Sequence, residues 1–398
     1  MLKILKLGGL LFLLVFLVLF SSFSLTDWRE YLLSLVYPET ISPEQLRAKY
    51  TSGPITILLV PGHDKEFRGA AWGGVREEEL NLRLARELFN FLSADNHFAI
   101  FTAREFSTGE YSPSLTSYFT ERRSEVETFT RNLRESFLAF IQSGELRRQD
   151  NPPHHNFARP EVALRLFGIN KWANDQDIDI VLHIHFNDDP ARRLRQPGRY
   201  SGFSVYIPER QYPNARASAA LGQVLYNTLS RHFPVSDLRQ ESQGIIEDQD
   251  LIAVGSRASR TGASVLAEYA YIYEPQIVSP SISQPVVLEM AWQTYLGIKK
   301  YFEPAWPDST VLLPHRFERH LSEGLRADRD VLVLQRLLQD EQLYPPAGKS
   351  NNSCPLNGNF GPCVKAAVVG FQQQYALPPT GYVGELTLEK LNERTNSL

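Results

Sequence analysis

The sequence predicts an α/β fold, a mixed, mostly parallel sheet flanked by helices, followed by a small three-helix domain at the C-terminus. Two apolar runs, 55–60 and 178–187, have the length and continuity of buried strands. Between the first run and a strand ending near Thr102 lies a helical leucine pattern over 80–92, and this strand–helix–strand order is typical of a parallel unit. Beyond about residue 325 the chain is short and helical with turns.

Each element can be placed along the chain from its periodicity. A helical stem leads to the first strand, and the remaining strands are expected at 97–102, 178–188, 200–208 and 264–272. The main helices are expected at 75–94, 160–176, 217–233 and 285–302. Segment 106–149 is a polar insert whose apolar residues recur at helical spacing, which fits either a surface helix or a flap over a site. The expected boundaries are 1–26, 27–53 (stem), 54–303 (main domain), 304–324 (linker) and 325–398.

The composition narrows the class of protein. A chain of 398 residues with 43% hydrophobic and 22% charged residues is ordinary globular material. Its net charge of −4 argues against a nucleic-acid partner, because phosphate recognition needs a basic surface. Cys354 and Cys363 are too few for a cysteine-rich zinc site. They can form one disulfide if the chain is exported, and they would stay reduced in the cytosol.

The N-terminal segment indicates the compartment. Lys3 and Lys6 are followed by an uncharged stretch, 7–26, which is long enough to cross a bilayer. The lysines should remain on the cytoplasmic side, and no clear cleavage site follows. We therefore expect residues 1–26 to be an uncleaved membrane anchor, with a cleaved signal peptide as the alternative, and the rest of the chain to lie in the extracytoplasmic cell envelope.

Three candidate metal ligands should meet at one edge of the sheet. His63 follows the first strand, Glu77 begins the next helix, and His185 ends the central strand. The carboxyl ends of parallel strands share an edge, and two nitrogens with one carboxylate oxygen suit a single Zn²⁺ per chain. Glu268, expected at another strand's end, is the candidate to take a proton from water.

Each of these residues also has an ordinary interpretation. His63 fits a hydrogen-bonding loop residue, Glu77 an acid at a helix N-terminus, and Glu268 a structural carboxylate. His183 and His185 are two positions apart, so they lie on the same face of the strand. Either of them can be the ligand, with the other supporting it.

Five motifs in order resemble those of the zinc-dependent N-acetylmuramoyl-L-alanine amidases. The first is a strand ending in Pro61-Gly62-His63, followed by Gly69-Ala70, Glu77 and Asn81-Leu82. The others are "FTAR" (101–104), "LHIHFND" (182–188), "GFSVYI" (202–207) and "ASVLAEYAYIYEP" (263–275). The resemblance covers about residues 55–302, apart from the insert.

This resemblance implies a zinc amidase catalytic domain over 54–303. His63, Glu77 and His185 would bind zinc, and Glu268 would be the general base. The enzyme would hydrolyse the amide between N-acetylmuramic acid and L-alanine. His183 or Asn187 would help to stabilise the oxyanion. The chain departs from the family pattern at Asp64-Lys65, where glycines are usual, at His183, which replaces a serine, and at Ala263, where proline is common. None of these departures removes a ligand.

The C-terminal segment resembles the three-helix peptidoglycan-binding domain. The matching residues are Val333-Leu334-Gln335, Leu338, "NGNFGP" (357–362), "AVVGFQQQYAL" (367–377), "TGYVG" (380–384), Thr387, Leu388 and Leu391. Cys354 and Cys363 bracket a short turn in this segment, and outside the cytoplasm we expect a disulfide between them. The domain would keep the enzyme on an insoluble polymer by raising its effective concentration there.

Together these patterns predict an envelope-anchored zinc amidase with a peptidoglycan-binding tail, active in wall remodelling or cell separation. Its expected partners are peptidoglycan and the membrane, with no nucleic acid. A monomer is the default, and the sequence does not identify an activator. Two alternatives stay open: a zinc peptidase that cuts stem or cross-bridge peptides, and a wall-binding protein without catalysis.

Overall fold

The computed structural model describes residues 41–153, 158–193, 195–255, 258–260 and 262–396. The predicted anchor, most of the stem and the loop histidines His154 and His155 lie outside these ranges. In the part of the chain that is described, no helix is both long enough and apolar enough to cross a membrane.

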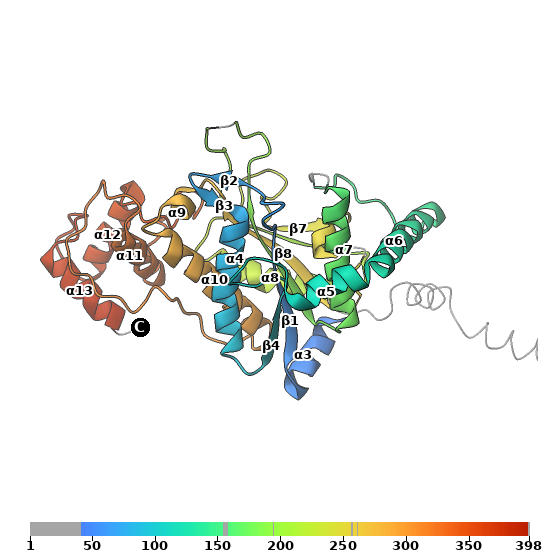
Figure 1. Cartoon of the computed structure of the whole chain (residues 1–398). Helices are drawn as coiled ribbons and strands as arrows, with labels where there is room; N and C mark the ends of the chain where they lie inside the picture. Colours follow the sequence, from blue (N-terminus) through green and yellow to red (C-terminus); the bar gives the residue numbers. More distant parts are fainter. Residues whose placement is uncertain (1–40, 154–157, 194, 256–257, 261, 397–398) are drawn as a thin grey trace, which may run out of the picture. The chain divides into compact units, whose positions relative to one another are not determined.

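A six-stranded mixed sheet with the order β4-β1-β5-β8-β6-β7 forms the centre of the main domain (Figure 1). Its strands are β1 (Ile55–Pro61), β4 (Phe98–Thr102), β5 (Ile180–Asn187), β6 (Ser204–Pro208), β7 (Ile245–Asp248) and β8 (Ala263–Tyr271). Neighbouring strands are parallel except β6 and β8, which are antiparallel. The predicted fold class and the central position of β5 are therefore confirmed.

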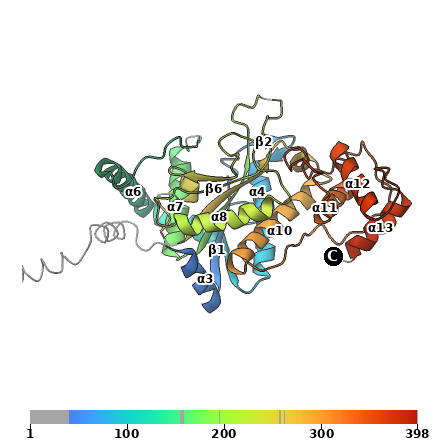
Figure 2. The ribbon, with the colours of Figure 1, turned by 180° about the vertical axis from the view of Figure 1, so that it is seen from behind.

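Helices cover both faces of this sheet. The helices of this domain are α3 (Pro43–Ser52), α4 (Glu77–Ser93), α5 (Pro113–Glu121), α6 (Arg123–Ser143), α7 (Pro160–Asp175), α8 (Ala215–Leu229), α9 (Pro275–Val278) and α10 (Ser283–Phe302), with a 3-10 turn η1 (Ile252–Val254). α4, α8 and α10 pack on one face around a large apolar core, and Figure 2 shows α8 crossing that face. On the other face, Ile169 and Trp172 of α7 cover Leu58 and Val181 of the strands.

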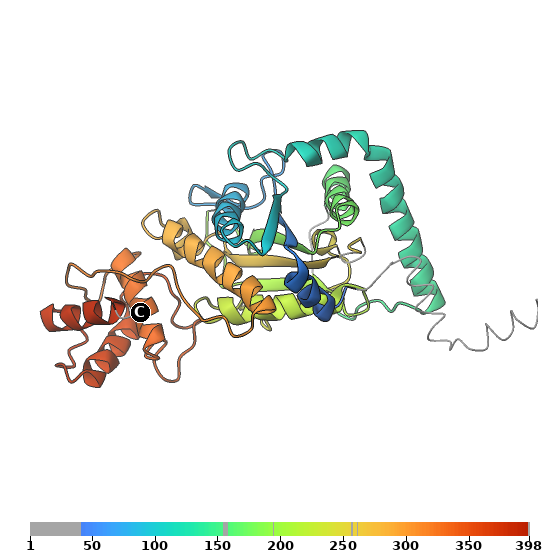
Figure 3. The same ribbon diagram turned by 90° about the horizontal axis from the view of Figure 1, so that it is seen from below.

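The insert forms α5 and α6, and α6 lies beside α7 (Figure 3). Its buried residues Val126 and Leu133 pack with Phe167 of α7, while Phe137 packs with Leu146 and Tyr212. Apolar contacts of this kind are what a helix packed on the domain should make.

Some elements differ from the sequence prediction. Two short strands, β2 (Ala71–Trp72) and β3 (Val75–Arg76), form a hairpin inside the first loop, and β7 completes the sheet edge. Two-residue strands are too short for a periodic signal, and β7 ends in two acidic residues that weaken its strand pattern. Glu268 is not at a strand's end as predicted, because β8 continues three residues beyond it to Tyr271.

The C-terminal segment contains α11 (Arg329–Asp340), α12 (Pro362–Gln374) and α13 (Glu385–Asn396). Leu334, Phe371 and Leu391, which lie in the matching motifs, are fully buried. A disulfide joins Cys354 to Cys363. Part of the predicted linker packs with this segment, because the backbone of Leu321 pairs with that of Val383.

A charged cluster lies at the C-terminal end of α4, and it supports a prediction about acid stability. Asp95 accepts hydrogen bonds from Lys299 Nζ (2.8 Å) and from the backbone N–H of His97 (3.1 Å). Burial alone would raise the pKa of Asp95, but these bonds lower it from 3.8 to about 2. The folded state thus favours the ionised carboxylate, so its stabilising effect is present above about pH 4 and is lost as the pH falls toward about 2.

Asp95→Asn should lower the free energy of unfolding by about 1–3 kcal/mol at neutral pH, as expected for a lost hydrogen bond to a charged group. The difference from the wild type should shrink as the pH falls from about 4 to about 2. Urea titrations across this range measure it, with the exposed Glu135→Gln as the matched control. A difference that stays constant with pH would contradict the assignment.

Candidate metal centre

The loop after β1 holds His63 in a defined orientation. Its backbone φ is +62°, and its ring Nδ1 lies 3.1 Å from the carbonyl oxygen of Phe67. The carboxylate of Asp64 accepts hydrogen bonds from the backbone N–H groups of Glu66 (2.9 Å) and Phe67 (2.7 Å). Asp64 therefore stabilises the loop that presents the imidazole.

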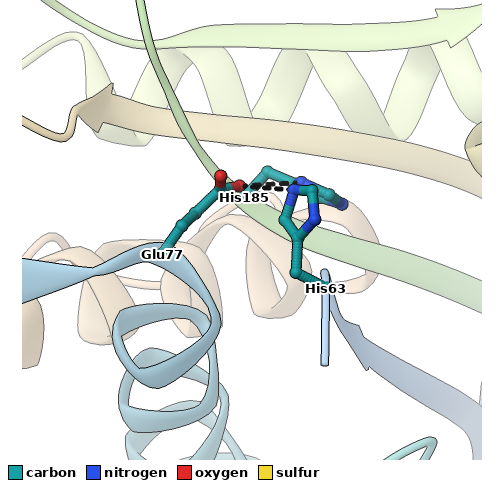
Figure 4. Close-up of side chains that lie close together, drawn as sticks. All are labelled: His63, Glu77 and His185. Atoms are coloured by element: carbon teal, nitrogen blue, oxygen red, sulfur yellow. Dashed lines mark hydrogen bonds and ion pairs between the residues drawn. The ribbon is translucent and has the colours of Figure 1, made fainter. Parts of the chain in front are cut away.

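Glu77, the first residue of α4, joins the two predicted histidine ligands. Its Oε1 lies 3.1 Å from both His63 Nε2 and His185 Nδ1, and its Oε2 accepts a hydrogen bond from the N–H of Ala70 (2.8 Å). Figure 4 shows the three side chains pointing toward one another from a loop, a helix and a strand. Their candidate ligand atoms all lie within 4.8 Å of one another.

Two glycines make this approach possible. A Cβ atom at Gly62 would lie 2.1 Å from the His185 ring. A Cβ atom at Gly69 would lie 2.3 Å from Glu77 Oε2 and 2.6 Å from the His63 ring. Real Cβ atoms do not come this close to other heavy atoms, so only glycine fits at either position. The glycine of the Pro61-Gly62-His63 turn therefore leaves the space that the His185 ring occupies in the cluster.

Burial and hydrogen bonding set the charge of the cluster. Burial opposes ionisation of Glu77, but the hydrogen bonds from His185 and His63 hold its pKa well below the usual range. Burial also favours neutral imidazoles, and it lowers the pKa of His185. For His63 burial is again the largest single effect and lowers the pKa, but the hydrogen bond and charge of Glu77, the contact with the Phe67 carbonyl and the charge of Asp64 together outweigh it and raise the pKa.

The residues fit a zinc ion. Two imidazole nitrogens and one carboxylate oxygen form a common donor set for catalytic zinc, with a fourth position left for water or substrate. The candidate ligand atoms already converge, and no side chain projects between them from Gly62 or Gly69. Among the described residues this is the group of three or more potential ligands that gathers at one point.

Glu268 lies on the strand next to His185. The two residues are register partners across the parallel β5–β8 pair, so their side chains share a face of the sheet. Glu268 Oε2 is buried and has no hydrogen-bond partner in the described part of the chain. Burial, followed by the charges of Glu77 and Glu241, raises its pKa well above that of an ordinary glutamate.

His183 and Asn187, the two predicted oxyanion candidates, have different surroundings. Neither ring nitrogen of the buried His183 has a hydrogen-bond partner among the described residues. Burial, and then the charge of His185, lowers the pKa of His183 to about 3, so the ring is neutral at physiological pH. The side-chain amide of Asn187 instead donates to the carboxylate of Glu241 (2.9 Å).

Glu241 was not found by sequence reasoning. It is 3% exposed and accepts hydrogen bonds from several neutral donors: Asn187 Nδ2, Tyr206 Oη, Ser236 Oγ and Tyr271 Oη. These donors come from β5, β6, β8 and the loop before Glu241. No local pattern in "RQESQG" signals this role, because the donors are distant in the sequence.

Comparison with known proteins gives the following similarities. Residues 327–391 match a family model described as "Putative peptidoglycan binding domain", in agreement with the prediction for 325–398. No protein among the curated sequences matches the chain.

Several solved structures are similar to it in part. The CwlD amidase of Clostridioides difficile, solved with the GerS lipoprotein, is 15% identical, with 63% of this chain and 99% of that chain covered and a TM-score of 0.40. The N-acetylmuramoyl-L-alanine amidase AmiC2 of Nostoc punctiforme is 17% identical, covering 63% and 98%, with a TM-score of 0.38. The amidase Ami1 of Mycobacterium smegmatis is 14% identical, covering 63% and 98%, with a TM-score of 0.40.

Proposed function

We propose that residues 54–303 form a zinc-dependent amidase that hydrolyses the amide bond between N-acetylmuramic acid and L-alanine in peptidoglycan. One observation carries the proposal: His63, Glu77 and His185 converge beside Glu268 of the neighbouring strand, whose buried Oε2 has no hydrogen-bond partner in the described part of the chain. The match of residues 327–391 to a peptidoglycan-binding model supports the choice of polymer.

His63, Glu77 and His185 would hold the zinc ion. When bound, zinc supplies Lewis-acid chemistry, which polarises a carbonyl and acidifies water. Glu268 accepts a proton at its carboxylate from the attacking water, whose oxygen bonds to the carbonyl carbon. As the carbon–nitrogen bond breaks, Glu268 returns this proton to the leaving amine of L-alanine. The raised pKa of Glu268 suits a group that must both take and deliver a proton.

Residues around Glu268 would support this step. The neutral His183 keeps a ring N–H without an acceptor, so it is available as a donor to the developing oxyanion. Glu241 fixes the amide of Asn187 beside the end of β5 and adds negative charge near Glu268. Asn187 would therefore orient the strand end that carries His185, because its side-chain amide already donates to Glu241.

The remaining parts of the chain would place this activity at the cell wall. Residues 1–26 would anchor the protein, 27–53 would be a stem, 304–324 would connect the domains, and 325–398 would bind peptidoglycan. Such an arrangement keeps an extracytoplasmic enzyme close to its insoluble substrate.

Digestion of purified peptidoglycan by the full-length chain in detergent tests the proposal. Mass spectrometry should find free stem peptides with an L-alanine amino terminus, and metal analysis should find one zinc per chain. Fragments cut inside the peptides would show that the protein is a peptidase and not an amidase. Binding to the polymer without zinc and without products would overturn the catalytic proposal.

A further inference from the structure

A pocket lies beside the metal centre, at the same edge of the sheet. It has a volume of about 230 Å³, and its lining includes Lys65 and Arg68 from the loop after β1 and Gly109 from the loop after β4. β1 and β4 are parallel neighbours, so these loops leave the same edge of the sheet. A substrate that extends along this edge can therefore contact both sites.

The first turn of α4 separates the pocket from the metal centre. Glu77 points toward the two histidines, whereas Glu78, the next residue, lines the pocket. Successive side chains on a helix diverge by about 100°. The same short segment thus supplies one carboxylate to each site.

Glu78 is a buried carboxylate with two long ion pairs and one oxygen that accepts no hydrogen bond. It is 3% exposed, and its Oε2 has no hydrogen-bond partner in the described ranges. Its Oε1 lies 4.0 Å from Arg68 Nε and 3.9 Å from Arg76 Nη1, which is too far for hydrogen bonds. Burying a charge in this state is costly, so a ligand that donates a hydrogen bond to Glu78 would be stabilised there.

Arg104 brings a buried positive charge to the same pocket. It is 2% exposed, and its guanidinium donates to the carbonyl oxygens of Gly109 (2.9 Å), Glu78 (3.2 Å) and Gly62 (3.4 Å). Within the described ranges it forms no ion pair with a carboxylate. Arg104 and the more exposed Arg68 therefore offer positive charge to a ligand carboxylate, close to the negative charge of Glu78.

We propose that this pocket binds a zwitterionic amino-acid group, an ammonium and a carboxylate on one carbon, at the end of a substrate side chain. The ammonium would donate to Glu78, and the carboxylate would pair with Arg68 and Arg104. The assignment rests on the proposed function, in which the substrate carries peptides. A diamino-dicarboxylic residue in the stem peptide presents this group, whereas lysine at the same place presents only the ammonium.

Calorimetry with two tripeptides tests the pocket without requiring hydrolysis. The probes are L-alanyl-γ-D-glutamyl-meso-diaminopimelate and its L-lysine counterpart, added to the full-length chain in detergent. The diaminopimelate peptide should bind at least about tenfold more tightly, as expected for an added pair of charged hydrogen bonds. Equal affinity for the two peptides would overturn the proposal.

Variants locate the effect in the pocket. Glu78→Gln should weaken binding of both peptides about tenfold, because both lose the ammonium contact. Arg68→Gln, which changes a side chain that is 57% exposed, should weaken only the diaminopimelate peptide and remove most of the preference. Glu135→Gln, an exposed glutamate on α6, is the matched control and should leave both affinities unchanged. If Arg68→Gln kept the full preference in a folded protein, the pocket would not be the site.

The same samples separate failure of this inference from failure of the proposed function. If the protein cleaves peptidoglycan at the L-alanine amide but shows no preference between the peptides, the pocket assignment is wrong and the proposed amidase activity stands. If the protein clearly prefers the diaminopimelate peptide but releases no product, the pocket assignment stands and the proposed amidase activity is wrong.

Discussion

Glu268→Gln should reduce the turnover of peptidoglycan by about 10²–10⁴-fold, the usual contribution of general acid–base catalysis. Glutamine keeps the shape of the side chain but cannot accept the proton of the attacking water. Glu268 is outside the group of three converging ligands, so zinc content should not change. Release of stem peptides, followed by mass spectrometry, measures turnover, and metal analysis of the same sample measures zinc.

A glutamate outside the metal centre provides the matched control for Glu268→Gln. Glu289 on α10 is fully buried, and burial raises its pKa as it raises that of Glu268. Its carboxylate, however, accepts hydrogen bonds from Gln293 and Thr310 away from the metal centre. Glu289→Gln should therefore alter stability and leave turnover unchanged. Full activity in a zinc-loaded Glu268→Gln protein would rule out Glu268 as the base.

Glu77→Ala should weaken zinc binding by more than about 100-fold, because even residues that only support a ligand change metal affinity by 10–100-fold. The carboxylate also joins the rings of His63 and His185, so its loss removes a ligand and the contact that aligns the other two. Hydrolysis should fall with the metal content, and a competition titration with a zinc chelator measures the affinity.

Glu79→Ala is the corresponding control two residues further along α4. The Glu79 side chain is 60% exposed and pairs with Arg76, outside the converging group. This variant should keep the zinc affinity of the wild type. Unchanged zinc affinity in Glu77→Ala would instead show that the metal is held elsewhere.

Much of the architecture was predictable because it depends on local patterns. Leu80, Leu84, Leu88 and Leu92 repeat with the helical period, and all four are buried in α4. The continuous apolar run of β5 requires cover on both faces, which predicts a central strand. His63 and His185 follow or end parallel strands, so their arrival at one edge could be expected before any coordinates.

Other features depend on register and on contacts between distant segments. The sequence places Glu268 in an apolar run, but only the β5–β8 pairing puts it opposite His185. The donors around Glu241 come from strands that are brought together by the sheet order, and the antiparallel direction of β6 places Tyr206 among them. No periodicity in one segment carries this information.

The division follows from how each property is encoded. By itself the amino-acid sequence determined the helices and the longer strands, the edge at which the three candidate ligands meet, and the binding segment at the C-terminus, because period, length and motif order act within short stretches. The tertiary structure alone decided which carboxylates are unpaired. Glu77 and Glu78 are chemically identical neighbours. Only the tertiary packing places Glu77 beside the two histidines and Glu78 in a pocket lined with cationic side chains.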